Sequence, residues 1–155
     1  MQQISDLQPA STCRRLRAPC GLGYRIRLLS QMMGRSLQQK LDPYGLTPFH
    51  WVVLCCLWEQ DGLATSDVAT RLQQVGGTIT GVITRMEERK LLYRQQDEGD
   101  RRIWRIWLTE AGQQLQQSLP TLADEVRLQT ISGFSDEEQQ QFSALVDRAI
   151  ANLSD

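Results

Sequence analysis

The segment QDEGDRRIWRIWLTEAG, residues 96–112, limits the possible folds of this chain more than any other stretch. Acidic residues around Gly99 favour a turn, and RRIWRIWL after it alternates as a half-buried β-strand does. A second strand, LLYRQ, precedes the turn. Thr109 is then a typical helix N-cap, with Glu110 in the first turn near the positive end of the helix dipole. The segment therefore predicts a β-hairpin that leads directly into a helix.

Two short helices joined by a glycine-bearing turn are predicted just before this hairpin. Thr65 or Ser66 can cap the first helix, and a turn containing Gly76-Gly77 separates it from the second. The second helix has one apolar face, formed by Ile79, Val82, Ile83 and Met86. This order matches a helix-turn-helix, with the hairpin as its wing.

Further helices flank this unit on both sides. The spacing of apolar residues predicts an amphipathic helix over residues 22–41, and Thr47 caps a nearly all-apolar helix, PFHWVVLCCLWEQ. Apolar residues recur at helical spacing over residues 113–152, interrupted by a break and a capping box that starts at Ser135. We expect a mostly α fold with a small β-hairpin wing (α+β), in which the first and last helices still need a partner for their apolar faces.

Composition and charge narrow the class of protein. Hydrophobic residues make up 41% of the 155 residues and charged residues 23%, which is typical of a single globular domain. Residues 110–155 hold eight acidic residues against two basic ones, whereas residues 64–109 hold eight basic against six acidic, so the middle of the chain can face a polyanion. The first twenty residues lack a signal-peptide core, and no apolar run approaches about 18 residues. We expect a cytoplasmic protein with no membrane segment.

The cysteines and the single histidine argue against a metal site and against catalysis. None of the four cysteines forms a C-x-x-C pair, so we expect no metal and no cofactor. His50 and Cys55 lie five residues apart on one helix, roughly 140° around its axis, which does not make a nucleophile–base pair. We therefore expect that the protein is not an enzyme.

Three motifs in this order resemble the MarR/SlyA family of bacterial transcription regulators. They are GLTPFHWVVL, the helix GGTITGVITRMEE, and DRRIWRIWLTEAG, which is similar to the family's D-x-R wing followed by its L-T-x-x-G helix entry. The resemblance covers about residues 22–152. It implies a winged helix-turn-helix, a homodimer built from the first and last helices, and binding to a palindromic operator in double-stranded DNA. Such regulators are usually repressors that a small ligand or oxidation releases.

The resemblance also divides the chain into parts. Residues 1–155 form a single MarR-type domain with a flexible N-terminal arm at 1–20. Residues 22–45 and 110–155 supply the dimerisation helices, and residues 46–109 form the DNA-binding winged helix-turn-helix lobe.

The candidate DNA-binding residues lie on the second helix of the helix-turn-helix and on the wing. Threonine hydroxyls on this helix suit close approach to phosphates and thymine methyl groups, and Arg85 can pair with guanine. By resemblance, Asp100 orients Arg102 toward a narrow minor groove, and Arg101 contacts phosphate. A solvated helix face and a surface ion pair are the alternatives. The full set is Ser66, Gly77, Thr78, Thr80, Thr84, Arg85, Arg94, Asp100, Arg101 and Arg102.

Other residues carry open alternatives. Arg94 either holds the wing strand or touches the DNA backbone. His50 and Trp51 are candidates for binding a small aromatic effector, the alternative for His50 being a satisfied, half-buried side chain. Cys20 is a candidate redox sensor near the start of the first helix, or simply a free thiol. Lys90 stands where relatives commonly have glycine, so either a left-handed cap costs about 1 kcal/mol or the chain turns differently.

DNA binding is not the only function that this pattern allows. A winged-helix protein-interaction module that does not bind DNA is the alternative, because the last third of the chain is acidic and the second helix has few long polar side chains.

Overall fold

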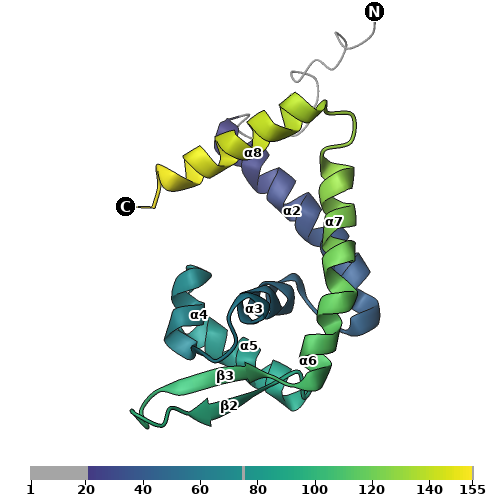
Figure 1. The fold of residues 1–155 in the computed structure, drawn as a ribbon. Helices are drawn as coiled ribbons and strands as arrows, with labels where there is room; N and C mark the ends of the chain where they lie inside the picture. The colour runs from purple at the N-terminus through teal and green to yellow at the C-terminus, as the bar shows by residue number, and fades with distance from the viewer. Residues whose placement is uncertain (1–20, 75, 155) are drawn as a thin grey trace, which may run out of the picture.

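The computed structural model describes residues 21–74 and 76–154, and it consists of helices and one small sheet (Figure 1). The expected flexible arm at 1–20 and Cys20 lie outside the described residues. The elements are α2 (Leu22–Leu41), η1 (Asp42–Tyr44), α3 (Pro48–Glu59), β1 (Leu63–Ala64), α4 (Thr65–Arg71), α5 (Gly76–Glu88), β2 (Leu92–Gln96), β3 (Trp104–Leu108), α6 (Glu110–Gln114), η2 (Leu115–Gln117), α7 (Leu119–Thr130) and α8 (Asp136–Ala151). The predicted fold class, mostly α with a β-hairpin wing, is confirmed.

The lobe that contains α3, α4, α5 and the sheet holds most of the core (Figure 1). Helix α3 lies at its centre, where Val53, Leu54 and Leu57 are fully or almost fully buried. The apolar face predicted for the second helix of the helix-turn-helix is confirmed, because all four of its residues on α5 are buried. This burial fixes which side of α5 remains in solvent.

Capping side chains begin several helices where the sequence places them. Thr47 Oγ1 accepts a hydrogen bond from His50 N (3.2 Å), and Thr109 Oγ1 accepts one from Gly112 N (3.1 Å). Ser135 forms the expected capping box at the start of α8. The expectation for α4 was wrong: this helix starts at Thr65 after Ala64, with no side-chain cap. The Thr65 hydroxyl instead donates to the carbonyl of Trp104 (3.3 Å), so it ties α4 to the wing.

The sheet has three antiparallel strands in the order β1-β3-β2, one more than the sequence predicted. The hairpin pairs Leu92 with Leu108 and Gln96 with Trp104, and its second strand starts at Trp104. The additional strand, β1, has only two residues and pairs Leu63 with Ile106. A two-residue strand has no period to detect, and its partner lies about forty residues further along the chain.

The chain leaves α5 through a left-handed residue. Lys90 has φ 57°, so the first of the two alternatives for this position is the one observed. Lys90 N donates to Glu87 O (2.8 Å) and Leu91 N donates to Met86 O (3.0 Å), the bonding pattern of a Schellman motif. These two hydrogen bonds offset the conformational cost of a side chain in this region.

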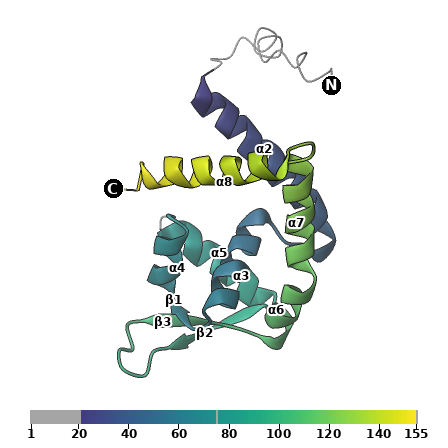
Figure 2. The ribbon, with the colours of Figure 1, turned by 45° about the horizontal axis from the view of Figure 1, so that its top comes forward.

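Helices α2 and α7 pack together outside the lobe, and α8 leaves the far end of α7 (Figure 2). Lys40 on α2 forms an ion pair with Glu125 on α7, and Ser36 Oγ donates to Gln129 Oε1 (3.3 Å). No residue of α8 is buried. Large apolar side chains are exposed along these helices: Leu22, Ile26, Leu29, Met32, Leu128, Leu145, Val146 and Ile150. Among the described residues, no helix is both long and apolar enough to cross a membrane.

Candidate nucleic-acid interface

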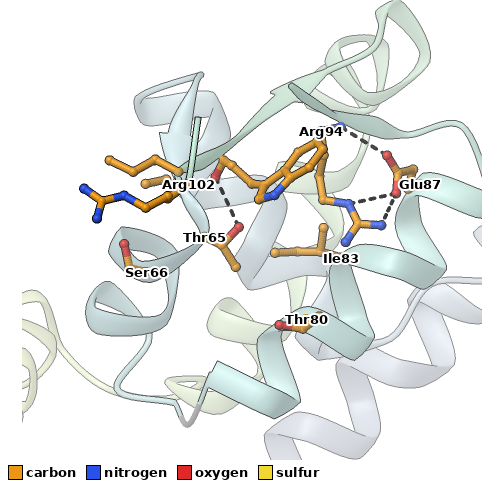
Figure 3. Close-up of a pocket in the computed structure, with 10 residues that line it drawn as sticks. Thr65, Ser66, Thr80, Ile83, Glu87, Arg94 and Arg102 are labelled. Atoms are coloured by element: carbon orange, nitrogen blue, oxygen red, sulfur yellow. Dashed lines mark hydrogen bonds and ion pairs between the residues drawn. The ribbon is translucent and has the colours of Figure 1, made fainter. Parts of the chain in front are cut away.

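A groove of about 730 Å³ lies between helix α5 and the wing, which we define as residues 92–108 (Figure 3). We call it the wing groove. Its lining comes from the end of β1, the start of α4, helix α5 and the wing: Ala64, Thr65, Ser66, Thr80, Ile83, Glu87, Arg94, Arg102, Ile103 and Trp104. Four of the ten candidate DNA-binding residues, Ser66, Thr80, Arg94 and Arg102, are therefore brought together here from three separate elements.

The remaining candidates on α5 lie on its solvent side. Thr78 and Arg85 are exposed and Thr84 is half-buried, whereas Ile79 is fully buried. Gly77 sits in the first turn, and a Cβ added there would meet nothing within 4 Å. This face offers hydroxyl groups, one guanidinium and open backbone, a surface that can approach another molecule closely.

The tip of the wing is held by hydrogen bonds to one aspartate. The Asp97 carboxylate accepts from Gly99 N (2.9 Å) and Asp100 N (3.0 Å), which closes the turn. Arg105 forms an ion pair with Asp97 and also donates to Gly62 O (3.0 Å). The hydrogen bond from Arg105, followed by those from the two backbone groups, lowers the pKa of Asp97. The bonds to Asp97 therefore hold the turn that carries the exposed arginines of the wing.

Arg102 points into solvent from this turn and is paired only with Asp100 among the ionic contacts described. Its Nη2 lies 2.8 Å from Asp100 Oδ2 and its Nε 3.0 Å from Oδ1, and the same Oδ1 accepts from the backbone N of Arg102. The side chain is 91% exposed. The hydrogen bond from Arg102 lowers the pKa of Asp100 and raises that of the guanidinium. Arg101 is also exposed.

Arg94 faces the groove but is bonded to Glu87 at the end of α5. Its Nη2 and Nε lie 2.5 Å and 2.9 Å from Glu87 Oε2, and its backbone N donates to Oε1 (3.1 Å). Figure 3 shows these bonds as dashed lines. The hydrogen bond from the side chain of Arg94 is the largest cause of the lowered pKa of Glu87, and the one from the backbone of Arg94 adds to it. The pair joins α5 to the wing, which is the first of the two roles considered for Arg94.

His50 and Trp51 lie on α3 and have partners within the lobe. The Nδ1 of His50 accepts from Thr47 N (3.2 Å), which completes the capping box at the start of α3. Burial, then the positive charges of Arg89 and Arg85, lower the pKa of His50. Trp51 packs edge-on against Trp58 at 5.6 Å between ring centroids. The satisfied-histidine alternative thus describes His50, and binding of an effector by these two residues stays a prediction.

Cys55 and Cys56 are free thiols in the body of α3. Burial raises the pKa of Cys55 to about 11 and also raises the pKa of Cys56. Both thiols are therefore protonated at neutral pH, and the thiolate that reacts with oxidants is scarce.

Six residues of the wing groove lie outside the ten candidates. Two of them, Ala64 and Ile83, are buried, and the other four are at least partly exposed: Thr65, Glu87, Ile103 and Trp104. Only the pairing of Glu87 with Arg94 could have been predicted from the sequence. These two opposite charges lie seven positions apart, one at the end of a helix and the other on the next strand. The exposure of the other three depends on how α4 and the wing pack.

Comparisons with known proteins agree on one family. Residues 46–104 match the model of the MarR family. The DNA complex of MepR from Staphylococcus aureus has a similar structure, with a TM-score of 0.80, 30% identity, and coverage of 85% of this chain and 98% of MepR. The chain belongs to the MarR family.

Two further relatives place this MarR-family chain among bacterial regulators. It is 28% identical over 134 residues to the HTH-type transcriptional regulator TtmR of Methylorubrum extorquens; this match covers 86% of the chain but only 66% of TtmR, just under two thirds of its length. The structure of BpsR from Bordetella bronchiseptica, in work on the regulation of its DNA binding by 6-hydroxynicotinic acid, has a TM-score of 0.76 and 29% identity. That match covers 83% of this chain and 97% of BpsR. The protein is thus a transcriptional regulator of the MarR type, a class of DNA-binding proteins rather than enzymes.

Proposed function

We propose that this MarR-family protein is a homodimeric repressor that binds a palindromic operator through α5 and the wing. The observation that carries the proposal is the wing groove, which holds Ser66, Thr80 and Arg102 between a helix that fits a major groove and a hairpin whose arginines reach beyond it. Recognition helices of this class lie in the major groove, and arginines favour a narrow minor groove. The DNA complex of MepR supports the same use of the fold.

The dimer is part of the proposal and rests on the helices outside the lobe. Leu22 and Ile26 on α2 and Leu145 and Ile150 on α8 are each more than half exposed, a set of apolar side chains that a monomeric protein rarely leaves in water. A second copy of the chain that packs against them would bury both sets at once. A two-fold dimer would then present two wing grooves to two half-sites about 34 Å apart.

Release by a small aromatic compound or by oxidation completes the proposal. Regulation of BpsR by 6-hydroxynicotinic acid supports an aromatic effector in this family. His50 and Trp51 remain the proposed contact residues, since they lie near the start of α3, between the η1 segment and the part of α3 that is buried in the lobe. The raised thiol pKa values disfavour oxidation of Cys55 and Cys56, and Cys20 stays the candidate for oxidation.

The experiment that tests this function begins with selection of duplexes from a random-sequence pool by the full-length protein. We expect the selected duplexes to share a palindrome with A/T-rich outer edges. Light scattering of the free protein should give twice the 17.7 kDa chain mass. Arg102→Ala should weaken binding by about 1–3 kcal/mol and relax the preference at these edges. Arg148→Ala on α8 removes the same charge from an exposed site outside the lobe. Once light scattering shows that this variant still has twice the chain mass, its binding should equal that of the parent.

Two results would contradict the proposal. If no duplex is enriched, the protein does not read DNA, and the protein-interaction module becomes the better account. If Arg102→Ala binds operators with A/T-rich and G/C-rich edges as the parent does, the wing tip is a solvated ion pair with no part in recognition.

A further inference from the structure

Two apolar side chains lie exposed inside the wing groove. Trp104 is 45% exposed and Ile103 is 37% exposed, and both line the groove beside Arg102. The backbone of Trp104 is held from two sides, because it pairs with Gln96 in the hairpin and its carbonyl accepts from the Thr65 hydroxyl (3.3 Å). The backbone that carries this aromatic side chain is therefore held in place, while nearly half of the residue's surface stays in water.

The proposed dimer does not account for this exposure. The exposed apolar side chains of α2 and α8 lie at the end of the molecule away from the wing (Figures 1 and 2). A copy that packs against those helices leaves the wing groove open. The apolar floor formed by Trp104 and Ile103 is thus separate from the surface through which the chain would dimerise.

The charges around this floor identify what fits it. Glu87, the acidic residue of the groove, is neutralised by its hydrogen bonds with Arg94. Arg102 is highly exposed on the wing, and Ser66 places a hydroxyl on the part of the groove that α4 forms. A cationic and hydroxyl rim over an apolar floor suits a chain that alternates anionic and apolar units. The sugar–phosphate strand of DNA is such a chain.

Geometry places that strand in the groove if α5 and the wing bind as proposed. Adjacent major and minor grooves of a duplex are separated by one sugar–phosphate strand. A helix in the major groove and a hairpin tip in the neighbouring minor groove must therefore straddle that strand. The wing groove is the space between these two elements.

We propose that Trp104, assisted by Ile103, packs against the deoxyribose units of the strand that crosses the wing groove. This inference rests on the proposed function and adds an apolar contact to its charged ones. Phosphate contacts release counterions and make affinity depend on salt, whereas an apolar contact does not. The two kinds of contact can therefore be separated in one titration series.

The test measures affinity against salt concentration for four proteins on the duplex that the parent selects from a random pool. Trp104→Ala should bind about tenfold more weakly per wing, with the parent's slope of log Kd against log salt concentration. Arg101→Ala should lower that slope. Tyr93→Ala is the matched control, because Tyr93 is an aromatic residue with the same 45% exposure on the opposite face of the same hairpin, and it should bind as the parent does.

A second measurement does not depend on the fold of an alanine variant. The difference in tryptophan fluorescence between the parent and Trp104→Phe reports Trp104, and its quenching by acrylamide should fall by at least about half when the duplex binds, since the ring loses its contact with water.

The possible outcomes distinguish failure of the Trp104 contact from failure of the proposed function. Parent-like affinity of Trp104→Ala, a changed salt slope in that variant, or quenching that stays the same with DNA would each overturn the inference while leaving the proposed function standing. Failure of the parent to select any duplex would instead remove the proposed function, and the inference with it.

Discussion

Gly112→Ala tests whether the wing and the helix that follows it depend on one close contact. Gly112 is buried in α6, and a Cβ built there would lie closer than 3.0 Å to the backbone oxygen of Leu91 and 3.1 Å from Leu108 Cδ2. Leu91 O also accepts a hydrogen bond from Thr109 N (3.1 Å). The oxygen cannot move away from the new methyl group without weakening that bond.

The loss of stability in Gly112→Ala can be added up from the overpacking at this site and from the hydrogen bonds that it weakens. Overpacking a buried site costs about 1–3 kcal/mol. The Thr109–Leu91 hydrogen bond contributes about 1 kcal/mol, and the cap that Thr109 forms with Gly112 N about as much. A helical alanine regains up to about 1 kcal/mol over glycine. We expect Gly112→Ala to lower the free energy of unfolding by about 3 kcal/mol.

Gly81→Ala is the matched control because it makes the same chemical change in a helix with open space. A Cβ at Gly81 meets nothing within 4 Å, so alanine should raise the free energy of unfolding by up to about 1 kcal/mol. Urea unfolding followed by circular dichroism, at one protein concentration for all variants, measures both changes. If Gly112→Ala proved as stable as the parent, the close contact at this helix entry would not exist in solution.

The remaining predictions concern ionisation. Hydrogen bonds from Arg94 are the main reason that the pKa of Glu87 lies below its ordinary value of 4.5. The ionised Glu87 therefore stabilises the fold fully above pH 4.5, and this stabilisation is lost as the pH falls through the lowered pKa. Glu87→Gln should therefore be less stable than the parent by under about 1 kcal/mol at neutral pH, and the difference in urea unfolding should vanish in acid; a constant difference would show that the charge is not involved. Cys55, with its pKa near 11, should be alkylated slowly at neutral pH in the folded protein and rapidly in urea, as peptide mapping would detect. Of the two proposed routes of release, we expect the aromatic compound rather than oxidation to act, so peroxide should leave the affinity for DNA unchanged in the parent and in Cys20→Ser alike. A loss of affinity that only the parent shows would instead assign release by oxidation to Cys20.

Much of the fold could be predicted because its signals are local. The caps at Thr47, Thr109 and Ser135 act within one helical turn, and the apolar period of α5 lies within thirteen residues. Side chains on the other face of α5, such as Arg85, could be named for the same reason. Strand β1 could not, because two residues carry no period, and α4 starts without the side-chain cap that Thr65 or Ser66 was expected to supply.

The exposure of side chains on the wing could not be predicted from the sequence alone. Alternation places Trp104, Ile106 and Leu108 on one face of the hairpin, and the sequence determines that much. The structure buries Ile106 and Leu108 and leaves Trp104 45% exposed. The reason is that Trp104 stands at the end of β3 farther from the start of α6, where the wing extends past the buried core of the lobe. The period of a strand fixes which way a side chain faces, but only the packing of α4, α5 and the hairpin decides whether anything covers it.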